Sequence, residues 1–189
     1  VGITDGATTH TGMSLDGPKQ AASRTDVTYA GTLVNHGSAA LGTSRLVFEV
    51  DGFDANGVDT SDPKRQVDSV KSITLSTGAA CTKHVDTLAI PNVTYPNRFI
   101  CPVTSLAVGG RISYTLVANY PTSLPNQDVD VDVDLDSITG TTFDGASAET
   151  TLNVDRSVEL DLGVQGPAIV GADRITGATL SVKNVGNVQ

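Results

Sequence analysis

The stretch Arg111-Ile-Ser-Tyr-Thr-Leu-Val-Ala-Asn119 decides the fold class, because large apolar residues recur along it at every second position. In an extended chain Ile112, Tyr114 and Leu116 share one face, and the residues between them share the other. One face should enter a core, and the other should meet water or a neighbouring strand. This alternation predicts a half-buried strand of an antiparallel sheet.

Further β-rich runs with turn residues between them lie on both sides of this stretch. They are Val27 to Val34, Arg45 to Val50, Val67 to Leu75, Arg98 to Val103, Asp128 to Ile138, Ala148 to Val154, Val158 to Val164 and Ile175 to Lys183. Short strands at this spacing predict an antiparallel β-sandwich. The long polar segment from Asp51 to Asp68 is expected to lie on the surface.

Composition supports strands and narrows the function. The 189 residues include 23 valines and 24 threonines, and no window reads as an amphipathic helix. The net charge of -9 and only five lysines make nucleic-acid binding unexpected, because that binding needs a basic surface. No apolar stretch approaches the roughly 20 residues of a membrane helix, so we expect no membrane insertion. The acidic, Ser/Thr-rich and lysine-poor composition favours an extracellular or cell-surface location.

A pair of short motifs repeats along the chain. Gly17-Pro18 and Asn35-His36-Gly37, expected to open and to close a strand, recur at Gly166-Pro167 and Asn184-Val185-Gly186, 149 residues later in both cases. This predicts one complete sandwich over residues 1–153 and the opening strands of a second copy over 154–189.

The second copy needs a partner for its strands, because two strands alone are marginal in water. The partner is the first domain, another subunit or further sequence. The residues expected to make this pairing are Val158, Leu160, Leu162, Leu180 and Val182.

The chain has two cysteines, Cys81 and Cys101, which lie 20 residues apart between strand-like runs. One disulfide would close a loop and stabilise the fold by about 3 kcal/mol. Two buried free thiols are the alternative reading.

The segment from Cys101 through Leu106 to Gly109, followed by the alternating strand, resembles the bacterial conserved-repeat family known as domain of unknown function eleven. The Asn-x-Gly of Asn35 and Gly37 is similar to the Asn-Asn-Gly that ends the second strand in that family. The resemblance implies an immunoglobulin-like sandwich, a disulfide between Cys81 and Cys101, and no catalytic residues. It also implies secreted or surface-anchored multidomain proteins, filaments and adhesins.

An acidic run, Asp128-Val-Asp-Val-Asp-Val-Asp-Leu-Asp136, is the most conspicuous local pattern. On a strand all its carboxylates share one face, and Asp128, Asp130 and Asp132 are candidate calcium ligands if a neighbouring loop completes the shell. The alternative is a half-buried strand whose charged face discourages edge-to-edge pairing.

A second oxygen-rich segment contains Asp54, Asn56 and Asp59, which are further candidate calcium ligands. Its spacing does not match an EF-hand. The alternative is an Asx-turn loop in which Asp and Asn bond their own backbone.

Three aromatic residues, Tyr95, Phe99 and Tyr120, could form a platform for stacking a sugar ring. The alternative is that they fill the ends of the sandwich core. Asn92 begins an Asn-Val-Thr sequon in a segment expected to be a loop between two prolines, and is a candidate glycosylation site.

Catalytic motifs are missing from the sequence. The histidines at positions 10, 36 and 84 lie far apart, and none belongs to a known hydrolytic motif. We therefore expect no enzyme activity. We expect the chain to be an extracellular structural or adhesive module of a bacterial surface protein or filament. Such a module would self-associate by strand exchange between subunits or contact neighbouring repeats. The alternatives are a carbohydrate-binding module with a glycan partner, and an accessory domain of a secreted hydrolase. Calcium is the one cofactor considered.

Overall fold

The computed structural model is all-β, as the alternating patterns predicted. It describes residues 11–86, 93–120, 124, 127–137, 146–155, 160–165 and 179–184, and these contain strands and no helix. The strands are β1 (Thr11–Asp16), β2 (Gln20–Ala22), β3 (Asp26–Asn35), β4 (Ser44–Val50), β5 (Val70–Leu75), β6 (Thr82–Asp86), β7 (Val93–Val103), β8 (Arg111–Asn119), β9 (Gln127–Ser137), β10 (Ser147–Asp155), β11 (Leu160–Gln165) and β12 (Thr179–Asn184).

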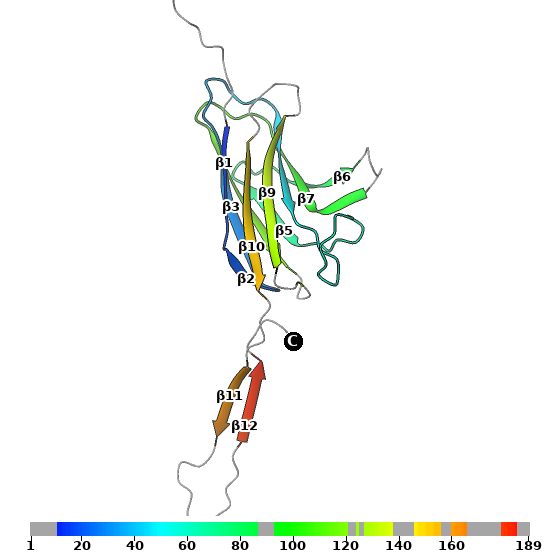
Figure 1. Cartoon of the computed structure of the whole chain (residues 1–189). Coiled ribbons are helices and arrows are strands. Elements are labelled where there is room, and N and C mark those ends of the chain that lie inside the picture. The colour runs from blue at the N-terminus through cyan, green and yellow to red at the C-terminus, as the bar shows by residue number, and fades with distance from the viewer. Residues whose placement is uncertain are drawn as a thin grey trace, which may run out of the picture.

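Ten of these strands form a sandwich of two sheets (Figure 1). One sheet has the order β1-β3-β8-β5, and the other has the order β2-β10-β9-β4-β7-β6. All neighbours within the two sheets are antiparallel except β2 and β10, which are parallel. The predicted antiparallel β-sandwich is therefore confirmed, with one short parallel exception at an edge.

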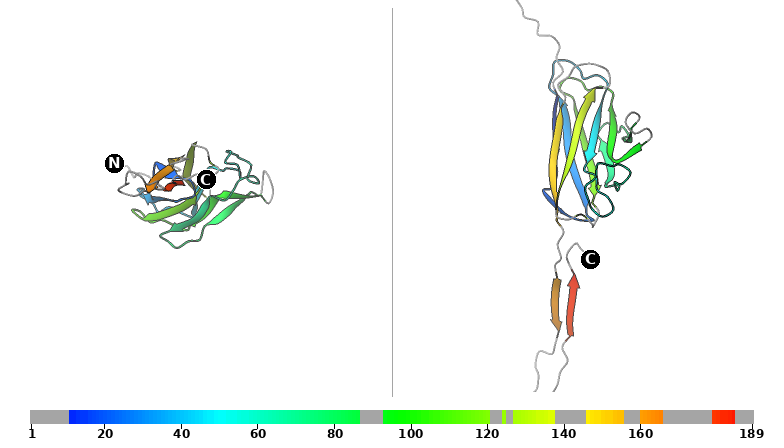
Figure 2. Two further views of the ribbon diagram at one scale, coloured as in Figure 1. Left: turned by 90° about the horizontal axis from the view of Figure 1, so that it is seen from below. Right: turned by 45° about the vertical axis from the view of Figure 1, so that its right-hand side comes forward.

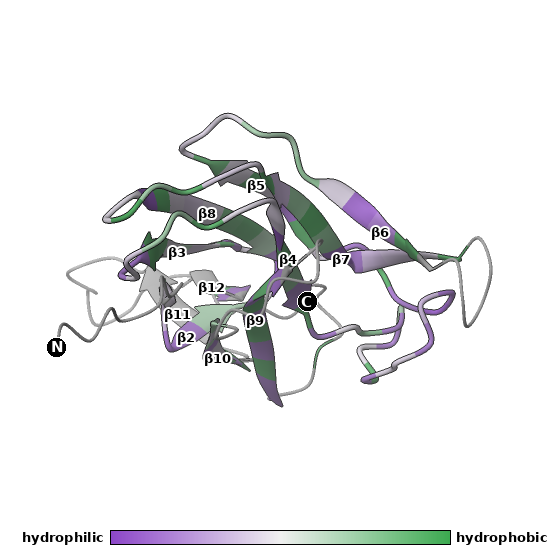
Figure 3. Ribbon diagram, turned by 90° about the horizontal axis from the view of Figure 1, so that it is seen from above, coloured by the Kyte–Doolittle hydropathy of each residue, from purple (hydrophilic) through white to green (hydrophobic). Residues whose placement is uncertain are grey.

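The core lies between the two sheets, where their apolar faces meet (Figure 3). Ile112, Tyr114 and Leu116 of β8 are buried, whereas Ser113 is exposed, as the period of two requires. Phe53 is buried as well, although it belongs to the polar segment expected on the surface. One aromatic residue thus ties that long loop to the core, and most of its polar residues stay outside.

Two expected boundaries were wrong. Gly17-Pro18 does not open the strand that Asn35 closes. That strand is β3, which begins at Asp26, whereas Gly17-Pro18 lies between β1 and the short β2. Pro96 does not bracket a loop, since it lies inside β7. Asn92 itself lies outside the described residues, so its glycosylation stays a prediction.

The repeated asparagine has a structural role in the first copy. Asn35 is fully buried at the end of β3, and its Oδ1 accepts a hydrogen bond from the N–H of Gly37 at 2.9 Å. Its Nδ2 donates to the carbonyl oxygens of Ala39 at 2.9 Å and Leu106 at 3.0 Å. The Asn-x-Gly motif therefore forms a tight turn and joins it to the Leu106 segment, which carries the other part of the family resemblance.

The disulfide between Cys81 and Cys101 is present. Cys101 is fully buried on β7, and Cys81 lies just before the edge strand β6. The bond joins these neighbouring strands, because Thr82 pairs with Ile100 in the same ladder. The cysteines are thus not free thiols, and the edge of the larger sheet is covalently attached to the core.

Candidate functional site

A polar pocket opens where β4 and β7 separate. The two strands pair as far as Glu49 and Arg98, beyond which the start of β7 pairs only with β6. Figures 1 and 2 show β6 and the start of β7 projecting sideways from the sandwich. The loop between β4 and β5 enters the gap, and the resulting cavity has a volume of about 590 Å³.

The base of this pocket is held by side-chain amides. Asn97 is buried, accepts a hydrogen bond from the N–H of Ser69 at 2.8 Å, and donates to the carbonyl oxygen of Val67 at 3.0 Å. Gln66 donates to the carbonyl oxygen of Thr60 at 2.9 Å. Its side chain crosses Gly52 so closely that a Cβ there would lie 2.0 Å from Nε2. Glycine at position 52 therefore makes room for the amide that shapes the pocket.

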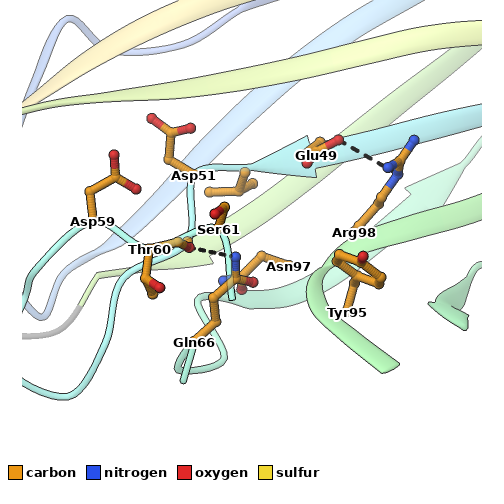
Figure 4. A pocket seen from close by; sticks show the side chains of 11 residues that line it. Glu49, Asp51, Asp59, Thr60, Ser61, Gln66, Tyr95, Asn97 and Arg98 are labelled. Atoms are coloured by element: carbon orange, nitrogen blue, oxygen red, sulfur yellow. Dashed lines mark hydrogen bonds and ion pairs between the residues drawn. The ribbon is translucent and has the colours of Figure 1, made fainter. Parts of the chain in front are cut away.

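Carboxylates and one aromatic ring form the walls (Figure 4). Asp51 and Asp59 come from the loop, and Glu49 and Arg98 come from facing positions of β4 and β7. The Nε of Arg98 lies 3.5 Å from a carboxylate oxygen of Glu49, so this ion pair is loose. Tyr95 is half-buried, and its ring packs beside His84 with the centroids 5.4 Å apart.

Burial raises the pKa of Asp51 above its ordinary value, and the nearby carboxylates of Asp130, Asp59 and Glu49 add to this effect. The N–H of Asp130 opposes it by donating to Asp51 at 2.9 Å. Negative charge is therefore concentrated at this end of the pocket. Arg98 is the only basic residue among those that line the pocket. A bound cation would relieve the repulsion.

The oxygen-rich segment after Asp51 forms an Asx turn. One oxygen of Asp54 accepts hydrogen bonds from the N–H groups of Asn56 at 2.8 Å and Val58 at 3.1 Å, and the other pairs with Arg65 at 2.8 Å. The bonds from Val58 and Asn56, and then the one from Arg65, hold the pKa of this carboxyl below its usual range. Asp54 is thus occupied by its own loop, as the alternative reading predicted.

The acidic run forms β9, with Val129, Val131 and Val133 buried and the aspartates facing outward. Thr151 donates to Asp130 at 2.8 Å, and Asn153 donates to Asp128 at 3.0 Å.

The calcium hypothesis gains no support from this arrangement. Among the residues that the structure describes, no group of three or more histidine, cysteine, aspartate or glutamate side chains is arranged to hold a metal ion. The candidate ligands on β9 and in the loop therefore remain a prediction from sequence alone.

The three aromatic residues do not form one platform. Tyr120 is fully buried, and its hydroxyl lies 2.9 Å from that of Tyr29, so it fills the core, as the alternative reading predicted, and is not available to stack a sugar. Burial raises the pKa of Tyr29 to about 12. Phe99 packs partly against the core, with the Nζ of Lys83 6.0 Å from its ring centroid. Only Tyr95 lines the pocket, and the sequence did not reveal that Asp51 and Gln66 would join it.

The histidines lie apart in the described structure. His36 lies against Gly12, and His84 lies against Tyr95, so the two do not share a site. His10 lies outside the described residues.

The hairpin β11–β12 reproduces the pairing of β1 with β3. In both hairpins six residue pairs are formed, and each residue of the second lies 149 positions after its counterpart in the first. The terminal pairs are Thr11 with Asn35 and Asp16 with Ala30 in the first copy, and Leu160 with Asn184 and Gln165 with Thr179 in the second. The internal repeat is therefore a repeat of structure as well as of sequence.

The second hairpin lacks the neighbours of the first within the described residues. β3 pairs with both β1 and β8, whereas β12 pairs only with β11. Val182 is 58% exposed, although its counterpart Leu33 is fully buried. Of the other residues expected to make the pairing, Val158 lies outside the described residues, and Leu160, Leu162 and Leu180 are strand residues of this hairpin.

These features define a two-sheet β-sandwich module with a polar side pocket and a repeated hairpin. No family model and no curated protein matches the chain. In the described part of the chain, no helix is long and apolar enough to cross a membrane.

Three of the solved structures that resemble the chain share little sequence identity with it. The CARDB domain of a Pyrococcus furiosus protein shares 9% identity at a TM-score of 0.46, covering 78% of this chain and 90% of that domain. The cohesin module of a Clostridium perfringens family 33 glycoside hydrolase shares 9% at 0.42, covering 78% and 98%. BslA, a bacterial hydrophobin, shares 13% at 0.41, covering 80% and 100%. At this level the likeness concerns the fold alone.

Proposed function

We infer that the chain is a structural or adhesive module of an extracellular bacterial protein built from tandem β-sandwiches. The observation that carries this proposal is the second hairpin, which keeps the register of the first at every pair. Stacked copies of one domain provide length and surface rather than chemistry. Membership of the conserved-repeat family that the sequence resembles is part of the same proposal.

The disulfide supports an extracellular location. Disulfides persist in oxidising compartments and are rare in the reducing cytosol. The bond joins Cys81 and Cys101 at the edge of the larger sheet, where an unpaired strand edge is open to unwanted pairing.

One close contact of the first copy has no counterpart in the sequence of the second. In the first copy Tyr114 of β8 crosses Gly31 and donates to the carbonyl oxygen of Ser14 at 2.6 Å. A Cβ at Gly31 would lie 2.4 Å from the Tyr114 ring and 2.0 Å from that carbonyl oxygen. The counterpart of Gly31 is Leu180. A Cβ at Gly31 would meet the backbone of its own partner strand as well as the tyrosine, so this contact of the first copy cannot be carried over unchanged to a leucine position.

Deleting the second hairpin tests the modular proposal. A chain that ends at residue 155 should melt at the same temperature as the full chain, because β11 and β12 belong to another unit. A drop of several degrees would show that the hairpin is part of the first sandwich and would overturn the proposal.

Light scattering over a range of concentrations tests strand exchange separately. If subunits exchange strands, the full chain forms oligomers that Val182→Asp dissociates, while Val58→Asp, which changes an equally exposed valine on the first sandwich, leaves them intact. A monomer at every concentration would exclude exchange and leave the tandem arrangement.

A further inference from the structure

The pocket between β4, β7 and the β4–β5 loop has the properties of a ligand site. Its volume of about 590 Å³ falls within the range of roughly 300–1,000 Å³ that is usual for small-molecule sites. It is assembled from residues far apart in sequence, and the buried Asn97 and the crossing of Gly52 by Gln66 hold its shape. The packing around these residues makes the cavity a feature of the fold.

The charge of the lining selects among ligands. Glu49 and Arg98 offset each other, which leaves the carboxylates of Asp51 and Asp59 without a basic partner among the lining residues. The outward-facing aspartates of β9 extend the negative surface. The N–H of Asp130 donates to the carboxylate of Asp51, and the N–H of Asp51 donates to the carbonyl oxygen of Asp130. Phosphates, sulfates and uronic acids are therefore repelled, whereas a cation is attracted.

The remaining lining groups indicate what surrounds that cation. Thr60, Ser61 and Gln66 offer hydroxyl and amide groups, and Tyr95 offers an aromatic face. The ring of Tyr95 can take either the apolar face of a sugar or a positive charge. The pocket is much larger than a single ammonium group needs, and its polar lining does not suit an apolar ligand.

We propose that this pocket binds an amino sugar that carries a free, protonated amine. Asp51 and Asp59 hold the ammonium group, Tyr95 packs against the sugar ring, and Thr60, Ser61 and Gln66 bond its hydroxyls. The site does not depend on the tandem arrangement of sandwiches, since all its residues belong to the first copy.

Calorimetric titration of the full chain tests this with three probes slightly below neutral pH, where the amine is protonated. The β-1,4-linked glucosamine dimer should bind at least tenfold more tightly than its N,N'-diacetylated form, which has lost the charge. It should also bind at least tenfold more tightly than ethanolamine, which has the charge and lacks the ring. Added salt should weaken binding of the dimer.

Variants locate the binding. Asp51→Asn and Asp59→Asn should each lower the affinity for the dimer at least fivefold and reduce its advantage over the acetylated form. Asparagine at position 51 keeps an acceptor for the N–H of Asp130. Tyr95→Ala should weaken both sugars, and Tyr95→Phe should restore them. Asp62→Asn is the matched control, because Asp62 belongs to the same loop and does not line the pocket.

Four results would overturn the proposal. Equal or tighter binding of the acetylated dimer would show that the amine is not recognised. Equal binding of ethanolamine would show that the sugar is not recognised. Undiminished binding in Asp51→Asn and Asp59→Asn variants with unchanged circular dichroism would place any interaction elsewhere, and no binding by the native chain would reject the site.

Discussion

Asp132 lies at the centre of a row of like charges on the outer face of the larger sheet. It pairs directly with Glu49 of β4 on one side and Glu149 of β10 on the other. Like charges directly opposite each other on neighbouring strands are destabilising. Burial, together with Glu149, Asp134, Asp130 and Asp51, raises the pKa of Asp132 from 3.8 to about 6. Replacing Asp132 by asparagine should therefore stabilise the protein at neutral pH.

The magnitude follows from the shift in pKa. About two pH units at ~1.4 kcal/mol each set an upper bound of about 3 kcal/mol. Asp132 is only partly buried, so solvent screening reduces the expected gain to about 1 kcal/mol. Because the pKa is higher in the folded state, ionisation of Asp132 destabilises the fold fully above about pH 6. As the pH falls from about 6 towards 3.8 this destabilisation is lost, and so is the advantage of asparagine.

Urea unfolding followed by circular dichroism measures this effect, and the optical signal suits a chain without tryptophan. Asp134→Asn is the comparison variant, because Asp134 lies on the same strand and face and pairs with Val47 and Ser147 instead of carboxylates; it should give a smaller gain, limited to its own repulsion of Asp132. At pH 7.5 Asp132→Asn should exceed both the native chain and the comparison variant in stability, and near pH 3.5 the gain should disappear. A gain that is equal in both variants, or that persists in acid, would refute the role of the cross-strand row.

Three further predictions concern the core, the disulfide and calcium. The double variant Cys81→Ala/Cys101→Ala should lower the free energy of unfolding by about 3 kcal/mol, and reductant should destabilise the native chain and leave the variant unchanged. Tyr29→Phe should lower the free energy of unfolding by about 1–2 kcal/mol, because it leaves the buried Tyr120 hydroxyl without its partner. The double Tyr29→Phe/Tyr120→Phe variant should lower it by less than the sum of the two single changes. Strict additivity would contradict this. Asp54→Asn should leave any effect of calcium on the melting temperature unchanged, since Asp54 is already bonded within its loop; a calcium-dependent rise that this change abolishes would restore Asp54 as a calcium ligand.

The sandwich could be recognised from local patterns because burial alternates with the period of a strand. Ile112, Tyr114 and Leu116 are buried as that period requires. The strands β1, β2 and β6 were not among the expected runs, and at three and five residues β2 and β6 carry too little pattern to distinguish a strand from a loop. Pro96 was read as the end of a loop because proline has no N–H for a ladder, yet β7 accepts it where the strand leaves β4.

The candidate sites were less predictable, because the partners of a polar side chain depend on the fold. From sequence, Asp54 and Asn56 allowed a calcium loop, although an Asx turn was the favoured interpretation. Arg65, eleven positions later, decides between them by pairing with the second oxygen of Asp54. Tyr95 and Tyr120 have the same side chain, but one lines a pocket and the other is enclosed with Tyr29.

The sequence by itself determined the strand class and the repeat, because both depend on period and spacing along the chain. Only the tertiary structure decided that the two cysteines pair, and that residues 49–66 meet residues 95–98 in one pocket. The physical reason is that β4 and β7 pair over only part of their length. Where they separate, the space between them is filled by side chains that no local pattern brings together.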